Sequence, residues 1–410
     1  MLAIAAAAAV GLAIAPGSAA FADTSVTSIA ELANAFATQP SGSTITLDAD
    51  LTGDDTSDTV KVPAGRTLTL DLNGHRLILV GGDPDTMGPA GLGVPAGTTL
   101  TIVDTAPGGA GALTTVGAFG GAGIGGGASE AAGTIIIDGG TITTTGGSMA
   151  AGIGGGHSRG GGAIMISGGT VTARATGDAA AIGGGVSGPG ASVSIGADAV
   201  VTATTPGDVA PFGSGSSFSD STTFGSLSNA GTLILPLYNR IDIPSGVTVT
   251  NSGTIRNGGV LGVDGTLVNT GIILNANTIF GPANVTGHNT TVLLDGNGGT
   301  APAAPAVLYA GSFQDGELAF PADATRTGFA FDGWFTQAVG GTQVTATTDL
   351  GLGGPQSITL YARWSDPAAA DDDSPELAAT GSDAVPIGLT GAALLLTGLA
   401  LYLRRRTAAD

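Results

Sequence analysis

The chain has 410 residues, of which 73 are glycine, none is cysteine and 11% are charged, and its formal net charge is −20. Twelve Lys and Arg residues cannot supply the basic surface of a nucleic-acid-binding protein, and the lack of cysteine excludes disulfides and cysteine-ligated metal sites. A hydrophobic content of 42% argues against disorder, so this glycine-rich chain with few charges suits short stacked strands joined by tight turns.

The first segment is typical of a secretion signal. Residues 2–15 are almost wholly Ala, Leu, Ile and Val, and Ala20 and Ala22 are the small residues of a cleavage site. We therefore expect residues 1–22 to be a signal peptide, cut between Ala22 and Asp23. No Lys or Arg precedes the apolar run, so we expect the natural start to lie upstream; a buried helix is the alternative interpretation.

A short helix is predicted directly after this segment. Residues 25–40 contain Ala-Glu-Leu-Ala-Asn-Ala-Phe, whose apolar spacing indicates one amphipathic face. Residues 67–72 and 99–104 then alternate between apolar and polar side chains, which predicts strands. We expect the helix to cap the open edge of the strands that follow it.

The next part of the chain is a regular sequence repeat. Ile124, Ile153 and Ile182 each stand in an Ala/Gly-Ile-Gly-Gly-Gly block, and their separations are 29 and 29. A less regular fourth copy begins at Phe212, one position later than this period predicts. A fixed period of this length is the signature of stacked structural units.

Within each unit the residue pattern has period two. Ile135 and Ile142 would point inward, whereas Thr141 and Thr143 would face water. One unit cannot bury its apolar row alone, so we predict that residues 23–290 form an all-β fold, a right-handed parallel β-helix (solenoid). At about 29 residues per coil, this segment would make about nine coils. The outward threonine rows also resemble those of ice-binding solenoids, although Thr is common on any exposed strand face.

Acidic side chains recur at one place in the coils. The positions of Asp71, Asp104 and Asp138 differ by 33 and 34, and later coils carry Ser167 and Gly196 there. Glycosidases use paired carboxylates, but a residue that follows the repeat is more typical of a turn, in which the side chain bonds nearby backbone. We expect turns; a catalytic groove is the alternative.

Other signs of chemistry are sparse. The Gly-Ile-Gly-Gly-Gly block resembles a phosphate loop, but its recurrence at the repeat period favours a coil corner. A polysaccharide lyase needs a basic residue, and the candidates in the stem are scattered: Lys61, Arg66, Arg76, Arg159, Arg174, Arg240 and Arg256. The histidines, His75, His157 and His288, form no metal motif. We therefore expect no catalytic residue, no cofactor and no metal site, with loose calcium binding by the aspartates left open.

A second, smaller domain begins near Thr291. Three sequence blocks mark it, at residues 292–300, 326–335 and 358–364. Together they resemble the Listeria–Bacteroides repeat, the B-repeat of internalin-type surface proteins. The resemblance implies a small β-grasp-like domain over residues 291–364.

The aromatic residues of these blocks have two possible roles. Both tryptophans of the chain, Trp334 and Trp364, lie in the blocks together with Phe329, Phe331 and Phe335. We expect these side chains to form the core of the small domain. An exposed Trp334 that stacks on carbohydrate is the alternative.

The C-terminal end consists of several parts in a fixed order. Residues 365–376 form an acidic linker rich in Pro and Ala. Residues 385–403 carry no charge and are long enough to cross a bilayer as a helix. Arg404, Arg405 and Arg406 follow as a stop-transfer cluster that would hold this end in the cytoplasm.

A pentapeptide stands between the linker and the apolar segment: Leu377, Ala378, Ala379, Thr380 and Gly381. Residues 377–410 as a whole resemble a Gram-positive sortase sorting signal of the LAxTG type used by actinobacterial sortases, with Ala378 where the commoner motif has Pro. The resemblance implies that a sortase thiolate attacks the Thr380 carbonyl and that Gly381 leaves with the membrane segment. Thr380 then becomes linked to an amine of the peptidoglycan precursor. A plain single-pass anchor with a chance pentapeptide is the alternative.

These features predict a secreted, non-catalytic protein anchored covalently at the outer face of the cell wall, whose precursor spans the membrane transiently. The expected partners are sortase, peptidoglycan and a glycan or host-protein ligand, without nucleic acid. The role expected is that of an adhesin or a surface-display stalk. Two alternatives stay open: a wall-tethered polysaccharide lyase or hydrolase, and a structural spacer without a ligand.

Overall fold

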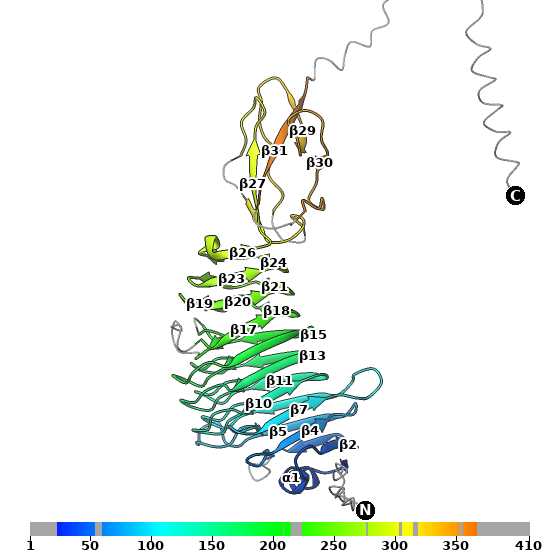
Figure 1. The fold of residues 1–410 in the computed structure, drawn as a ribbon, viewed down its shortest axis with the longest axis vertical. Helices are drawn as coiled ribbons and strands as arrows, with labels where there is room; N and C mark the ends of the chain where they lie inside the picture. Colours follow the sequence, from blue (N-terminus) through cyan, green and yellow to red (C-terminus); the bar gives the residue numbers. More distant parts are fainter. Residues whose placement is uncertain are drawn as a thin grey trace, which may run out of the picture. The chain divides into compact units, whose positions relative to one another are not determined.

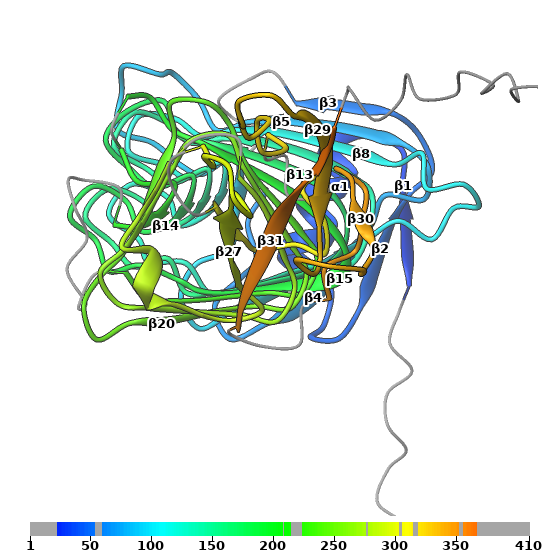
Figure 2. The same cartoon turned by 90° about the horizontal axis from the view of Figure 1, so that it is seen from above.

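The computed structural model describes residues 23–53, 60–207, 209–214, 224–275, 278–302, 306–314, 319–351 and 356–366. Strands up to residue 287 build parallel coils, and strands from Thr290 onward build a five-stranded sheet of their own. In Figure 1 the coils lie one above another, from β2 in blue to β26 in yellow-green, and Figure 2 looks along this stack.

The first face of the coils is an unbroken run of parallel strands. Each strand pairs with the equivalent strand of the next coil, so that Ile135 lies opposite Ile164. The strands are β1 (Thr24–Val26), β2 (Thr44–Leu47), β4 (Thr67–Asp71), β7 (Thr99–Val103), β10 (Thr134–Ile137), the first halves of β13 (Ala163–Arg174) and β15 (Ser192–Thr204), β17 (Ser226–Asn229), β20 (Thr248–Asn251), β23 (Thr266–Asn269) and β26 (Val285–Gly287).

The second face is built in the same way. Ile142 lies opposite Val171 and Leu113 in the neighbouring coils. Its strands are β3 (Leu51–Gly53), β5 (Arg76–Val80), β8 (Ala112–Val116), β11 (Thr141–Thr145), the second halves of β13 and β15, β18 (Thr232–Leu235), β21 (Thr254–Asn257) and β24 (Ile272–Asn275).

The third face changes character along the stack. In the glycine-rich coils it is reduced to two-residue strands, which are β6 (Leu92–Gly93), β9 (Ile124–Gly125), β12 (Ile153–Gly154), β14 (Ile182–Gly183) and β16 (Phe212–Gly213). In the later coils it is a sheet of three longer strands, which are β19 (Arg240–Ile243), β22 (Val260–Val263) and β25 (Thr278–Phe280). The short 3-10 helix η1 (Pro282–Asn284) precedes β26.

The predicted isoleucine stack is confirmed. Ile153 pairs with Ile124 on one side and Ile182 on the other, and all three side chains are fully buried. The fourth copy also joins this stack, since Phe212 lies opposite Ile182. Thr141 is exposed, as the alternating pattern predicted. Stacking buries each apolar row against the rows above and below it, which one coil alone cannot do.

The coil length is not constant, so the coil count that assumed about 29 residues per coil holds only for the central coils. Before them, Leu68 and Leu100 pair across 32 positions, and Leu100 and Ile135 pair across 35. In the central coils the hydroxyls of Thr115 and Thr144 bond from one coil to the next across 29 positions. Further along, the amides of Asn251 and Asn269 make the equivalent contact across only 18 positions. The shorter coils have lost the glycine-rich loops and close through two-residue turns such as Gly258–Gly259.

Buried asparagines stabilise these shorter coils. Asn229 donates from Nδ2 to Asn251 Oδ1 at 2.6 Å, and Asn251 donates in the same way to Asn269 at 2.7 Å. A second ladder joins Asn257 to Asn275 at 2.7 Å. Each of these Nδ2 groups thus donates to the next coil, while the Oδ1 atoms of Asn229 and Asn257, which begin the two ladders, are buried without a hydrogen-bond partner among the described residues.

The predicted N-terminal cap is present as helix α1 (Ile29–Thr38). The Ser28 side chain accepts from the Glu31 N–H at 3.3 Å, and the Thr27 N–H donates to the Glu31 carboxylate at 2.8 Å. This arrangement resembles a capping box in which Glu31 bonds back to the residue before the N-cap, and the Thr27 N–H lowers the pKa of Glu31. Leu32 and Phe36 are fully buried against the first coil, so the helix covers its open edge.

The small domain is a mixed five-stranded sheet in the order β28-β27-β31-β29-β30. Its central pair, β27 and β31, is parallel, and the described residues of the domain contain no helix, so the β-grasp expectation is met only in the sheet. The core is formed by Val292, Leu308, Phe313, Trp334 and Leu360. The strands are β27 (Thr290–Asp295), β28 (Ala306–Leu308), β29 (Ala330–Phe335), β30 (Gln343–Val344) and β31 (Gln356–Ser365).

One tyrosine of the segment after β28 belongs to the core of the coils. Tyr309 is 5% exposed and packs within the same buried cluster as the coil residues, and its carbonyl accepts from the Ile273 N–H at 3.1 Å. Burial raises the pKa of Tyr309 to about 12. The neutral phenol is therefore favoured in the folded chain.

This burial predicts a loss of stability at high pH. In the unfolded chain the phenol ionises near pH 10, whereas in the folded chain it holds its proton to about pH 12. The neutral phenol contributes its full stabilisation of the folded chain below pH 10. As the pH rises from 10 to 12, the free energy of unfolding falls by up to about 2 kcal/mol. Thermal melting of the parent and of Tyr309→Phe at about pH 9 and about pH 11 measures how much stability each protein loses between the two pH values. The parent should lose more stability than the variant; equal losses would contradict the assignment.

Candidate functional site

Of the aspartates that recur along the coils, Asp71 bonds its own turn, as expected, whereas Asp104 and Asp138 bond groups farther along or in another coil. Asp71 is 6% exposed, and its carboxylate accepts from the N–H groups of Asn73 at 2.9 Å and Thr105 at 3.1 Å and from the Thr105 hydroxyl at 2.6 Å. Asp104 accepts from the N–H groups of Gly74 at 2.8 Å and Gly111 at 2.7 Å. These carboxylates hold one coil to the next.

The third aspartate of the series behaves in the same way. Asp138 accepts a hydrogen bond from the hydroxyl of Ser167, the residue that occupies its place one coil later. Where the later coil has Ser167 in place of an aspartate, the contact between coils is therefore kept, because the serine hydroxyl donates to the carboxylate of Asp138.

Two basic side chains of the stem, Lys61 and Arg66, bond to groups outside their own coil. Lys61 pairs with Glu130 at 2.7 Å, although the two are far apart in the sequence. Arg66 donates to the carbonyls of Ala37 at 3.0 Å and Gln39 at 2.6 Å, at the C-terminal end of α1. A cation there is favourably placed for the helix dipole. These contacts hold the first coils and the helix together.

A small charged contact lies at the edge of the second face. His75 Nδ1 lies 3.3 Å from the Asp50 carboxylate, which also accepts from the Arg76 N–H at 2.9 Å. The Arg76 N–H, with a lesser contribution from His75, lowers the pKa of Asp50. Across the described ranges, no group of three or more His, Cys, Asp or Glu side chains is placed to hold a metal ion.

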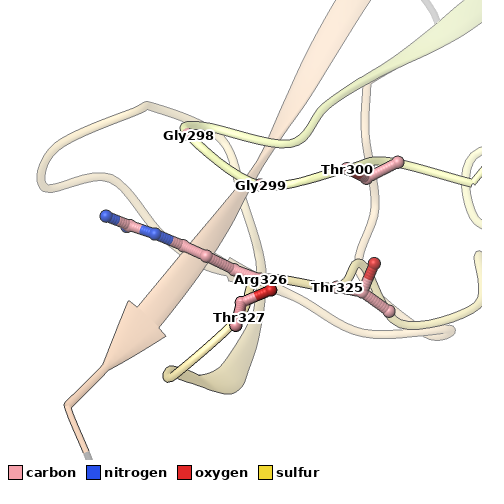
Figure 3. Close-up of a pocket in the computed structure, with 6 residues that line it drawn as sticks. All are labelled: Gly298, Gly299, Thr300, Thr325, Arg326 and Thr327. Carbon is pink, nitrogen blue, oxygen red and sulfur yellow. The ribbon is translucent and has the colours of Figure 1, made fainter.

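The small domain contains a polar pocket that the sequence did not indicate. It has a volume of about 630 Å³, and Figure 3 shows its lining, with the Gly298–Thr300 loop on one side and the Thr325–Thr327 segment on the other. Two backbone hydrogen bonds join these segments, Thr300 N–H to Thr325 O at 2.7 Å and Thr325 N–H to Thr300 O at 3.0 Å.

The glycine loop of this pocket is held firmly by its neighbours. Asn297 has a left-handed backbone (φ 45°), and its side-chain amide donates to the carbonyls of Ala338 at 3.1 Å and Ala362 at 3.0 Å. Trp364 Nε1 donates to the Gly296 carbonyl at 3.0 Å. These hydrogen bonds fix the conformation of the glycine loop.

The chemistry of the pocket is that of hydroxyls and one cation. The Arg326 guanidinium lies beside Gly298, where a Cβ atom would be 3.7 Å from the guanidinium carbon. Thr300, Thr325 and Thr327 line the rest of the pocket. Such a lining suits a polar ligand with hydroxyl or carboxylate groups. The sequence blocks around residues 298 and 326 were recognised, but only their pairing in space makes a pocket.

The aromatic residues of the small domain fall into two groups. Trp334 is fully buried and donates from Nε1 to the Ala322 carbonyl at 3.2 Å, which confirms the core interpretation. Phe331 packs edge-to-face on both tryptophans, Trp334 at 5.5 Å and Trp364 at 5.6 Å between ring centroids. Phe329 departs from the expectation, since it is 37% exposed.

The residues predicted to carry processing and anchoring lie almost wholly outside the described residues. These are Ala20 and Ala22 of the signal, the pentapeptide 377–381, the apolar segment 385–403 and the arginines 404–406; Asp23 is the first residue described. In the part of the chain that the structure describes, no helix has the length and apolar character of a membrane span.

Comparison with known proteins identifies the small domain. Residues 291–363 match the family model of the Listeria-Bacteroides repeat domain. No curated protein and no solved structure matches the chain. The repeat is found in surface proteins, typically extracellular ones, so the chain carries a domain of that class after its parallel coils.

Proposed function

We propose that the chain is a secreted surface protein which a sortase links to peptidoglycan, and that its coils and repeat domain bind glycan or protein ligands without catalysing a reaction. The match of residues 291–363 to a repeat domain of surface proteins carries this proposal. The order of pentapeptide, apolar segment and arginines in residues 377–410 supports the anchoring.

A binding role is supported by the form of the molecule. Stacked coils present an extended, regular surface, which is the usual binding device of solenoid proteins. The carboxylates of Asp71 and Asp104 accept hydrogen bonds from their own and neighbouring coils, an arrangement suited to structure rather than to proton transfer. The Arg326 pocket offers a preorganised polar site on the repeat domain.

Retention on an array of glycans and matrix proteins tests this function. The full-length protein, purified in detergent, should be retained by at least one ligand while the eluate contains no glycan fragments. The Arg326→Gln variant should lose retention on any ligand whose carboxylate occupies the pocket. Release of glycan fragments would overturn the proposal in favour of a polysaccharide-active enzyme. Neither retention nor fragment release would overturn it in favour of a structural spacer.

A further inference from the structure

Two exposed aromatic side chains belong to the third side of the short coils: Phe280 lies on β25, and Tyr238 lies in the turn that leads into β19. Tyr238 is 79% exposed and Phe280 is 54% exposed, and they are the aromatic residues of the described coils that lie open to solvent. Leu237, beside Tyr238, is 57% exposed. Aromatic residues make up only 4% of the chain, so an exposed ring on this face and a second one in the turn before it call for an explanation.

The turn that carries Tyr238 is longer than the equivalent turn of the next coil. The segment 236–239 separates β18 from β19, whereas Gly258 and Gly259 alone separate β21 from β22. The longer segment projects Leu237 and Tyr238 beyond the glycine turn. Tyr238 also has a left-handed backbone (φ 70°), a conformation that costs an aromatic residue about 1 kcal/mol or more and is typical of functional positions.

An ion pair lies next to the Phe280 ring. Arg240 Nε donates to Asp242 at 2.6 Å, and the guanidinium lies 5.9 Å from the centre of the Phe280 ring. Asp242, Gly262 and Phe280 occupy the same register position in successive coils. Gly262 supplies no side chain, and a Cβ atom there would collide with the Asp242 carboxylate. The Asp242 carboxylate therefore lies over Gly262, on the strand between β19 and β25.

We infer that this face, formed by Tyr238, Arg240, Asp242 and Phe280, binds a neutral glycan chain. The two rings offer apolar faces for sugar rings, and the Arg–Asp pair offers donors and acceptors for hydroxyls. Arg240 and Asp242 are the charged residues of β19, β22 and β25, so the face is electrically balanced. An anionic polymer gains nothing there and is repelled by a chain of net charge −20. The inference rests on the proposed ligand-binding function and gives it a surface and a ligand class.

Binding of defined hexasaccharides tests this surface. The probes are linear hexasaccharides of β-1,4-linked glucose, β-1,4-linked N-acetylglucosamine and α-1,4-linked glucose, with a heparin hexasaccharide as the anionic probe. Titration calorimetry on the full-length protein in detergent should detect at least one neutral probe. Tyr238→Asn and Phe280→Thr should each weaken that binding by about ten-fold.

The variants are chosen to leave the fold intact. Asparagine tolerates the left-handed turn better than tyrosine does, and threonine suits an exposed strand position, so melting should be unchanged or raised. Val339→Asn, which removes an 87% exposed side chain from the repeat domain, is the matched control and should bind like the parent.

The other outcomes overturn the assignment in distinguishable ways. Neutral binding that persists in Tyr238→Asn and Phe280→Thr would reject this face but keep the proposed ligand-binding function. Binding of heparin alone would reject the neutral ligand class. No binding of any hexasaccharide would reject the glycan assignment, while wall linkage and the protein ligands of the array would still test the proposed function separately.

Discussion

Replacing Ile153 with aspartate is expected to unfold the coils around it. Ile153 is fully buried between Ile124 and Ile182, and the alternating pattern of the coil leaves no basic side chain in that row. The variant loses the apolar contact and buries an uncompensated carboxylate, which together cost at least about 4 kcal/mol. The melting temperature should therefore fall by about 10 °C or more.

Met165→Asp is the matched control for this experiment. Met165 lies in the adjacent coil on β13, but its side chain points outward and is 49% exposed. A charge there stays in water, so stability should change by less than about 0.5 kcal/mol. Circular dichroism and calorimetric melting compare the two variants. Melting of Ile153→Asp at the temperature of the parent would show that the isoleucine stack does not hold the coils together.

Replacing Gly154 with alanine is expected to have the second-largest effect. Gly154 has a φ of 134°, and a Cβ atom at this position would collide with the carbonyl oxygen of Gly183 in the next coil. The backbone strain and the collision cannot both be relieved without separating the two coils. We expect a loss of about 2–4 kcal/mol in the free energy of unfolding.

Gly97→Ala separates the two causes. Gly97 also has a left-handed backbone (φ 78°), but nothing lies within 4 Å of a Cβ atom there. This variant should lose only the backbone term, about 1 kcal/mol. Denaturant unfolding of both variants measures the difference. Equal losses in the free energy of unfolding would mean that glycine is needed at position 154 only for its backbone conformation, and not to let the coils approach each other closely.

The sequence predicted the central coils well because one period governs them. Ile124, Ile153 and Ile182 recur at a fixed spacing, and each needs a partner to leave water, so periodicity alone implies the stack. The period-two alternation likewise predicted that Ile135 and Ile142 would be buried. The cap helix was predictable from its amphipathic pattern and lies within the expected residues.

The later coils were mispredicted because the spacing of the central coils was extrapolated to them. The Asn-x-Gly steps at Asn229, Asn251 and Asn269 were visible in the sequence, and their shorter, unequal separations of 22 and 18 already departed from the period. Their meaning depends on side-chain amides bonding across coils, which a hydrophobic pattern does not report. A polar ladder can therefore set the coil length where an apolar period is absent.

The candidate sites could not be predicted because they arise from convergence in space. The Arg326 pocket exists because residues near 300 and 325 pair as neighbouring backbone segments. The face formed by Tyr238, Arg240, Asp242 and Phe280 depends on the strand register that aligns Asp242, Gly262 and Phe280 in three successive coils. Neither arrangement leaves a contiguous motif in the sequence.

The mass of the C-terminal peptide released from purified walls by a muramidase tests the central claim most directly. We predict a chain that ends at Thr380, with its carbonyl joined by an amide bond to a peptidoglycan amine. Thr380→Ala should abolish this species and leave the protein in the membrane or the medium. A wall-associated chain that continues through Gly381, or unchanged wall linkage of Thr380→Ala, would contradict it.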